Sequence, residues 1–142
     1  MPLINFGAIL NFAEEIESQD LAFYTAAANN PTCAETKELF EQLAGNVKKN
    51  IQSVQRTRRE NVTEMILEPI KDFTRAPFRV EPVSADNISA IEALEIARKL
   101  EDRAQRYYLE AAEKIKALPE VARTLKTIAK KRAAQCKKLD TV

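Results

Sequence analysis

The sequence predicts an all-α protein, a bundle of four long helices arranged as two pairs that a long crossover joins. Three observations predict it. Only two glycines occur in 142 residues, whereas sheet proteins need glycine repeatedly in their turns. Strong helix formers, among them alanine, glutamate, lysine and leucine, dominate the composition. Apolar residues recur at spacings of three and four, as they do on one face of a helix. The length suits a single domain with one core.

The first repeat, about 5–65, contains two predicted helices. The first covers 5–28 and ends at the NNPT segment, because proline interrupts a helix. Its inner face is predicted to consist of Leu10, Ala13, Glu17, Leu21, Tyr24 and Ala28. Thr32 and Glu35 have the spacing of a capping box, so the second helix should begin just after Thr32 and continue to near Met65. Its inner face is predicted to consist of Leu39, Leu43, Val47, Asn50, Ile51 and Val54.

The crossover, about 66–87, cannot be a continuous helix, because it contains Pro69, Pro77 and Pro82. Phe73 and Phe78 indicate that it lies against the bundle. A connection of this length lets the second helix pair start at either end of the first pair.

The second repeat, about 88–140, opens with another capping box, Ser89 and Glu92. The third helix should run from there to about residue 116. Pro119 suits the first turn of the fourth helix, which should end near residue 139. The short turn inside each pair makes its two helices antiparallel neighbours.

The two pairs are related by an internal repeat. A shift of 84 residues places Glu17 on Glu101 and Tyr24 on Tyr108. A shift of 85 then relates the second helix to the fourth, with Val47 on Arg132 and Asn50 on Gln135. Matching alanines and leucines are expected of any two apolar faces. A carboxylate on a core face is different, because burying it costs free energy unless it is paired. We therefore expect Glu17 and Glu101 to share one site.

The segments IESQDLAFYTAAA (16–28) and LEDRAQRYYLEAA (100–112) resemble the rubrerythrin signature, a ligand glutamate followed by an aromatic–tyrosine pair on a long helix. The resemblance extends over 8–56 and 92–140. It implies a ferritin-like four-helix bundle with a di-iron centre that reduces peroxide or oxidises ferrous iron, often in a homodimer. The first and third helices would each supply a glutamate, and the other two would each supply a Glu-x-x-His pair. The four-cysteine iron site that many members carry is excluded, because the chain has two cysteines.

Position by position, only two of the six family ligands are present. Glu17 and Glu101 match the glutamates of the first and third helices. The four other positions hold Val47, Asn50, Arg132 and Gln135, and the chain contains no histidine. Two carboxylates cannot neutralise two iron ions, and arginine is a cation that does not deprotonate. We therefore expect no metal and no cofactor.

The substitutions suggest a replacement for the metal. We predict that Arg132 bridges Glu17 and Glu101, with Asn50 and Gln135 completing the hydrogen bonds, because a guanidinium offers five fixed donors. The family places the second tyrosine of each pair near its metal, which makes Tyr24 and Tyr108 the aromatic residues expected beside this site. Ordinary packing, with a hydrogen-bond partner for the hydroxyl, is the interpretation we favour for both tyrosines.

The function expected from these residues is that of a binding, assembly or regulatory module that has lost di-iron catalysis. The alternative is a metal-dependent oxidoreductase that reduces peroxide or oxidises ferrous iron. In it, Glu17 and Glu101 would hold a metal ion, helped by Asn50, Gln135 and a carboxylate from a second copy of the chain. A third possibility is that the centre binds a small molecule or anion beside Arg132.

The net charge names no partner, but charge is distributed unevenly along the chain. The net charge is +1, but residues 1–87 sum to −4 (9 basic, 13 acidic) and residues 88–142 to +5 (13 basic, 8 acidic). Such halves pair inside a bundle or in a homodimer. Residues 123–142 hold seven basic groups and one acidic group with no aromatic residue between them, so we expect a solvated face and not a nucleic-acid surface. With no membrane segment, no signal segment and Cys33 and Cys136 as free thiols, we expect a cytoplasmic protein.

Overall fold

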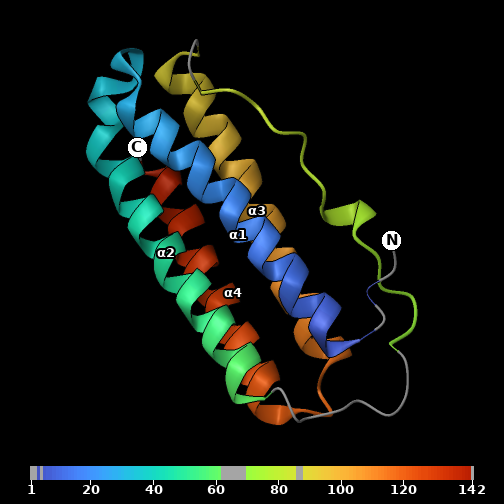
Figure 1. The fold of residues 1–142 in the computed structure, drawn as a ribbon. Helices are drawn as coiled ribbons and strands as arrows, with labels where there is room; N and C mark the ends of the chain where they lie inside the picture. The colour runs from blue at the N-terminus through green and yellow to red at the C-terminus, as the bar shows by residue number, and fades with distance from the viewer. Residues whose placement is uncertain (1–2, 4, 62–69, 86–87, 142) are drawn as a thin grey trace.

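The structure is a computed structural model, and it describes residues 3, 5–61, 70–85 and 88–141. Most of these residues lie in four α-helices, as the sequence predicts (Figure 1). In chain order the helices are α1 (Phe6–Asn29), the 3₁₀ helix η1 (Pro31–Thr36), α2 (Lys37–Glu60), the 3₁₀ helix η2 (Ala76–Phe78), α3 (Ala90–Lys114) and α4 (Pro119–Asp140). None of the described helices has a stretch long and apolar enough to span a bilayer.

The helices form two antiparallel pairs, α1 with α2 and α3 with α4 (Figure 1). The pairs meet through α1 against α3 and through α2 against α4. The described part of the crossover, residues 70–85, runs along the bundle to the end at which α3 begins (Figure 1). As a result α3 runs antiparallel to α1, and the four helices can direct side chains from all sides into one centre.

Three of the four helix starts agree with the predictions. The Ser89 Oγ atom accepts a hydrogen bond from the backbone N–H of Glu92 at 3.2 Å, as expected for an N-cap. The Asn5 Oδ1 atom caps α1 in the same way, accepting from the N–H of Ala8 at 2.8 Å. Pro119 lies in the first turn of α4.

The predicted start of the second helix is wrong. Residues 31–36 form the 3₁₀ helix η1, and the α-helix begins only at Lys37, with no side-chain hydrogen bond from Thr36 capping it. The tighter i→i+3 hydrogen bonds of a 3₁₀ turn take up the residues in which the sequence predicts the first α-helical turn. At the other end, α2 stops at Glu60, and the Asn61 backbone N–H bonds the Thr57 carbonyl at 3.1 Å. The predicted end near Met65 lies outside the described residues.

The interior has two apolar regions with polar side chains between them. One region joins the first half of α1 to the second half of α3 and the crossover, and the other joins the second half of α1 to the first half of α3. Phe73 and Phe78 are buried in the first region and pack against the Tyr107 ring, so the crossover lies on the bundle as predicted. The buried polar and charged side chains of the central layer are Glu17, Asp20, Asn50, Glu101, Arg103, Arg132 and Gln135.

Candidate functional site

Arg132 of α4 lies at the centre of the bundle with none of its side chain exposed. Its Nη1 atom donates to Glu101 Oε2 of α3, and its Nη2 atom donates to Glu17 Oε2 of α1. The bridge between the two glutamates that the sequence predicts is therefore present. Nη2 also pairs with Asp20 Oδ2 at 2.9 Å. One guanidinium thus contacts three carboxylates from two helices.

Asp20 and its partner Arg103 are not among the site residues predicted from the sequence. The Arg103 Nη2 atom donates to Asp20 Oδ1 at 2.5 Å, and its Nη1 atom donates to the Phe78 carbonyl at 3.0 Å. A signal for Asp20 exists, because a spacing of three from Glu17 puts both on one face of α1. The prediction placed Leu21 there, and Leu21 is only half-buried. The repeat offers no help, because position 104 is an alanine.

Two further side chains bind Glu101. The Gln135 Nε2 atom donates to Oε1 at 2.8 Å, as predicted, and the Tyr24 hydroxyl donates to Oε2 at 2.5 Å. Tyr24 therefore belongs to the polar centre, beyond its role in packing. Its repeat counterpart Tyr108 is fully buried, and its hydroxyl has no hydrogen-bond partner among the described residues. The predicted hydroxyl partner is therefore confirmed for Tyr24, whereas the same prediction is wrong for Tyr108.

The predicted role of Asn50 is wrong. Only 1% of its surface is exposed, yet neither Oδ1 nor Nδ2 has a hydrogen-bond partner among the described residues. Among the described residues, Gln135 supplies the amide that donates to Glu101, and Asn50 does not contribute to this hydrogen bonding. Val47, one turn earlier on α2, is buried in the second apolar region. Val47 and Asn50 of α2 therefore add nothing to the charge network.

The charge network does not balance when all its members are ionised. Glu17, Asp20 and Glu101 against Arg103 and Arg132 leave one negative charge. Burial, together with Glu17 and Glu101, outweighs the two arginines and raises the pKa of Asp20 to about 7. Burial also raises the pKa of Glu101. A proton on Asp20 would make the network neutral.

Arg132 stays a cation throughout. Burial on its own would lower the pKa of its guanidinium, but Glu17, Glu101 and Asp20 outweigh that effect and hold the pKa well above its ordinary value. The centre of the bundle therefore holds a permanent positive charge at the place that the rubrerythrin resemblance assigns to iron.

The residues present do not fit a pair of iron ions. Among the described residues, no group of three or more Asp, Glu, His or Cys side chains is arranged to hold a metal ion. The carboxylate oxygens of Glu17 and Glu101 that face the centre already bind Arg132. Neutral amides and a valine stand where the family has glutamate and histidine, and they are poor ligands for a redox iron.

Comparisons of the chain with models of protein families, with curated proteins and with solved structures found no match.

Proposed function

We propose that this chain is a divergent, rubrerythrin-like member of the ferritin-like proteins in which a charge network replaces the di-iron centre. We propose further that it acts as a binding, assembly or regulatory module. The observation that supports this is the fully buried Arg132 guanidinium, paired with Glu17, Asp20 and Glu101.

The physical argument is one of charge. A guanidinium is a fixed cation, and like charges a few Å apart in a low-dielectric interior repel each other strongly. The three buried carboxylates of the central layer already neutralise Arg132 and Arg103. A metal ion in the same layer would have to displace Arg132 and leave a buried cation unpaired, which costs free energy.

The test is the iron content of the purified protein after anaerobic loading with ferrous iron. We expect the natural chain to retain no stoichiometric iron. The Arg132→Glu variant, loaded alongside, would place a fourth carboxylate beside Glu17, Asp20 and Glu101, so we expect it to retain more iron than the natural chain. Circular dichroism checks that the variant is folded. Stoichiometric iron in the natural chain that a Glu17→Ala variant loses would overturn the proposal.

That contrary outcome would support the oxidoreductase alternative. The observation in its favour is Asp20, which adds a third buried carboxylate to Glu17 and Glu101. If the natural chain takes up iron, the same sample should consume hydrogen peroxide with oxidation of the ferrous iron, and the Glu17→Ala variant should not.

A further inference from the structure

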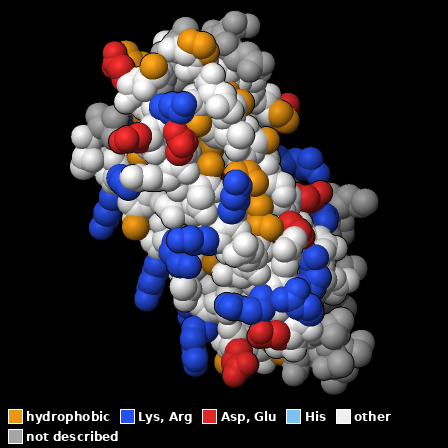
Figure 2. Space-filling view, turned by 60° about the vertical axis from the view of Figure 1, so that its left-hand side comes forward, with side chains coloured by type: hydrophobic (Ala, Val, Ile, Leu, Met, Phe, Trp, Pro, Cys, Tyr) orange, Lys and Arg blue, Asp and Glu red, His pale blue; other side chains and the backbone are white. Residues whose placement is uncertain are grey.

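A pocket of about 400 Å³ opens between α2 and α4. It lies outside the charge network, and it is lined by Asn46, Lys49, Asn50, Lys131, Ala134, Gln135 and Lys138. Three of these residues are lysines and none is acidic. Many Lys and Arg side chains also lie on the side of the bundle that contains α2, which faces the viewer in Figure 2. We name this feature the α2–α4 pocket. Its charge favours an anion.

Asn50 is the most buried of the lining residues, at 1% exposure. Its amide offers both donors and an acceptor, and among the described residues none of them is paired. Buried polar groups are nearly always hydrogen-bonded. The other buried amide, Gln135, already donates to Glu101 and accepts from Asn46 at 3.2 Å. Asn50 is therefore the lining residue whose unpaired atoms indicate a ligand.

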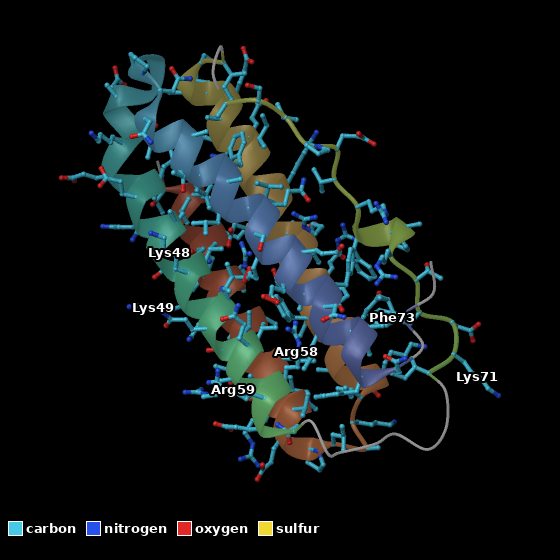
Figure 3. All side chains as sticks on the ribbon, in the orientation of Figure 1. Lys48, Lys49, Arg58, Arg59, Lys71 and Phe73 are labelled. Atoms are coloured by element: carbon cyan, nitrogen blue, oxygen red, sulfur yellow. The ribbon has the colours of Figure 1, made fainter. Side chains whose placement is uncertain are left out.

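The lysines that line the pocket can form ion pairs with a bound anion. Lys49 and Lys131 are exposed, and neither ammonium group forms an ion pair or hydrogen bond with a side chain or carbonyl that the structure describes. Lys49 points away from α1 on the outer side of α2 (Figure 3). Lys138 donates one hydrogen bond to Gln42, and its ammonium has further donors.

We propose that the α2–α4 pocket binds a small phosphate, either free or as the phosphoryl group of a metabolite. The phosphate oxygens accept from the lysine ammonium groups and from the Asn50 Nδ2 atom. At neutral pH free hydrogen phosphate also carries a hydroxyl, which donates to Asn50 Oδ1. A phosphate monoester is mostly the dianion and lacks that proton, so a hydroxyl of the metabolite itself takes this place. Few other small anions supply both acceptors and a donor. This inference rests on the binding role proposed above and gives it a ligand class and a place.

The test is a calorimetric titration of the full chain with inorganic phosphate at pH 7 and low ionic strength. We expect saturable binding at one site per chain. The Lys49→Gln and Lys131→Gln variants should each bind about tenfold more weakly, since each loses one charge-assisted hydrogen bond. Their matched controls are Lys48→Gln and Lys130→Gln, which remove the same charge from exposed neighbours outside the pocket. Both controls should bind like the natural chain.

The Asn50→Leu variant separates binding from folding. It should lose phosphate binding while its melting temperature stays the same or rises, because an apolar side chain of similar size replaces an unpaired buried amide. Sulfate, which has no hydroxyl at this pH, should bind more weakly than phosphate. Glycerol 3-phosphate with glycerol as its control distinguishes the two sources, since only a site for phosphorylated metabolites binds it more tightly than inorganic phosphate.

Three results would overturn the site: no saturable phosphate binding, equal weakening by Lys48→Gln and Lys49→Gln, or unchanged binding by Asn50→Leu. Iron uptake in the loading experiment would overturn the loss of di-iron chemistry without changing this titration, so failures of the two proposals are distinguishable.

Discussion

At the scale of single residues, Arg132 determines what the centre of the bundle can do. Three carboxylates in an apolar interior repel each other and lose their hydration. Arg132 offsets both effects because its planar fork reaches Glu17 on α1 and Glu101 on α3 at once. A lysine could supply the charge but not the fixed fork geometry.

The Arg132→Met variant should lose ~3–5 kcal/mol of unfolding free energy, because three buried carboxylates lose their shared cation. Urea unfolding followed by circular dichroism measures the loss. The matched control is Lys131→Met, at an exposed neighbour on α4, which should change stability by no more than about 0.5 kcal/mol. Adding Glu17→Gln and Glu101→Gln to Arg132→Met should recover much of the loss, since neutral amides need no cation. Equal stability of Arg132→Met and Lys131→Met would contradict the central role of the guanidinium.

Asp20 predicts how stability depends on pH. Its pKa is raised from 3.8 to about 7 in the folded chain, so between these values the folded state holds a proton that the unfolded state has released. The stability that Asp20 contributes is therefore complete below about pH 4 and is lost as the pH rises through about 7. Urea unfolding at a series of pH values from 5 to 8 should show the unfolding free energy falling.

The Asp20→Asn variant should show a smaller fall over the same range, because an amide cannot release a proton there. Part of the fall should remain, since the pKa of Glu101 is raised as well. A variant with the same pH dependence as the natural chain would show that Asp20 does not titrate in this range.

The ion pairs of Arg132 with Glu17 and Glu101 could be predicted because the internal repeat aligns two glutamates that no ordinary core would tolerate. The pair of Asp20 with Arg103 could not, because neither side chain has a charged counterpart at the equivalent position of the other repeat. Asn50 shows a different limit. Its burial follows from the helical period, but its lack of a partner depends on where neighbouring side chains end.

At the scale of helices, local sequence signals such as capping residues predict most of the helix boundaries. Ser89 caps α3 as its spacing from Glu92 predicts, and α1, α3 and α4 begin and end within two residues of their predicted bounds. The start of α2 is the exception, because the chain passes through η1 before Lys37. Whether a turn continues as 3₁₀ or α-helix depends on small differences in hydrogen-bond geometry that a capping pattern does not encode.

The Ser89→Ala variant tests the cap. It should lose ~1 kcal/mol of unfolding free energy, because the N–H of Glu92 loses its side-chain acceptor at the start of α3. Ser18→Ala is the matched control, since Ser18 is exposed in the interior of α1 and caps no helix. Urea unfolding compares the two. A loss of the same size in Ser18→Ala would mean that the measurement does not report capping.

At the scale of the molecule, buried charges join the two helix pairs. Glu17 and Asp20 belong to the first pair, whereas Arg103 and Arg132 belong to the second. The two oppositely charged halves of the sequence therefore form ion pairs with each other inside the bundle. This is one of the two arrangements expected from the sequence, the other being a homodimer. The homodimer stays a prediction, which sedimentation can test.

This arrangement predicts that the first helix pair does not fold by itself. A peptide of residues 1–61 would leave its apolar faces uncovered, and helices in proteins owe most of their stability to the packing of those faces. Self-association would not rescue it, because two copies would bring two Glu17 and two Asp20 carboxylates together without Arg103 or Arg132. Circular dichroism should show low helicity and no cooperative thermal transition. Adding a peptide of residues 88–142 should restore both, since it supplies the two arginines. A cooperative transition in residues 1–61 alone would show that the buried ion pairs are not required for the first pair to fold.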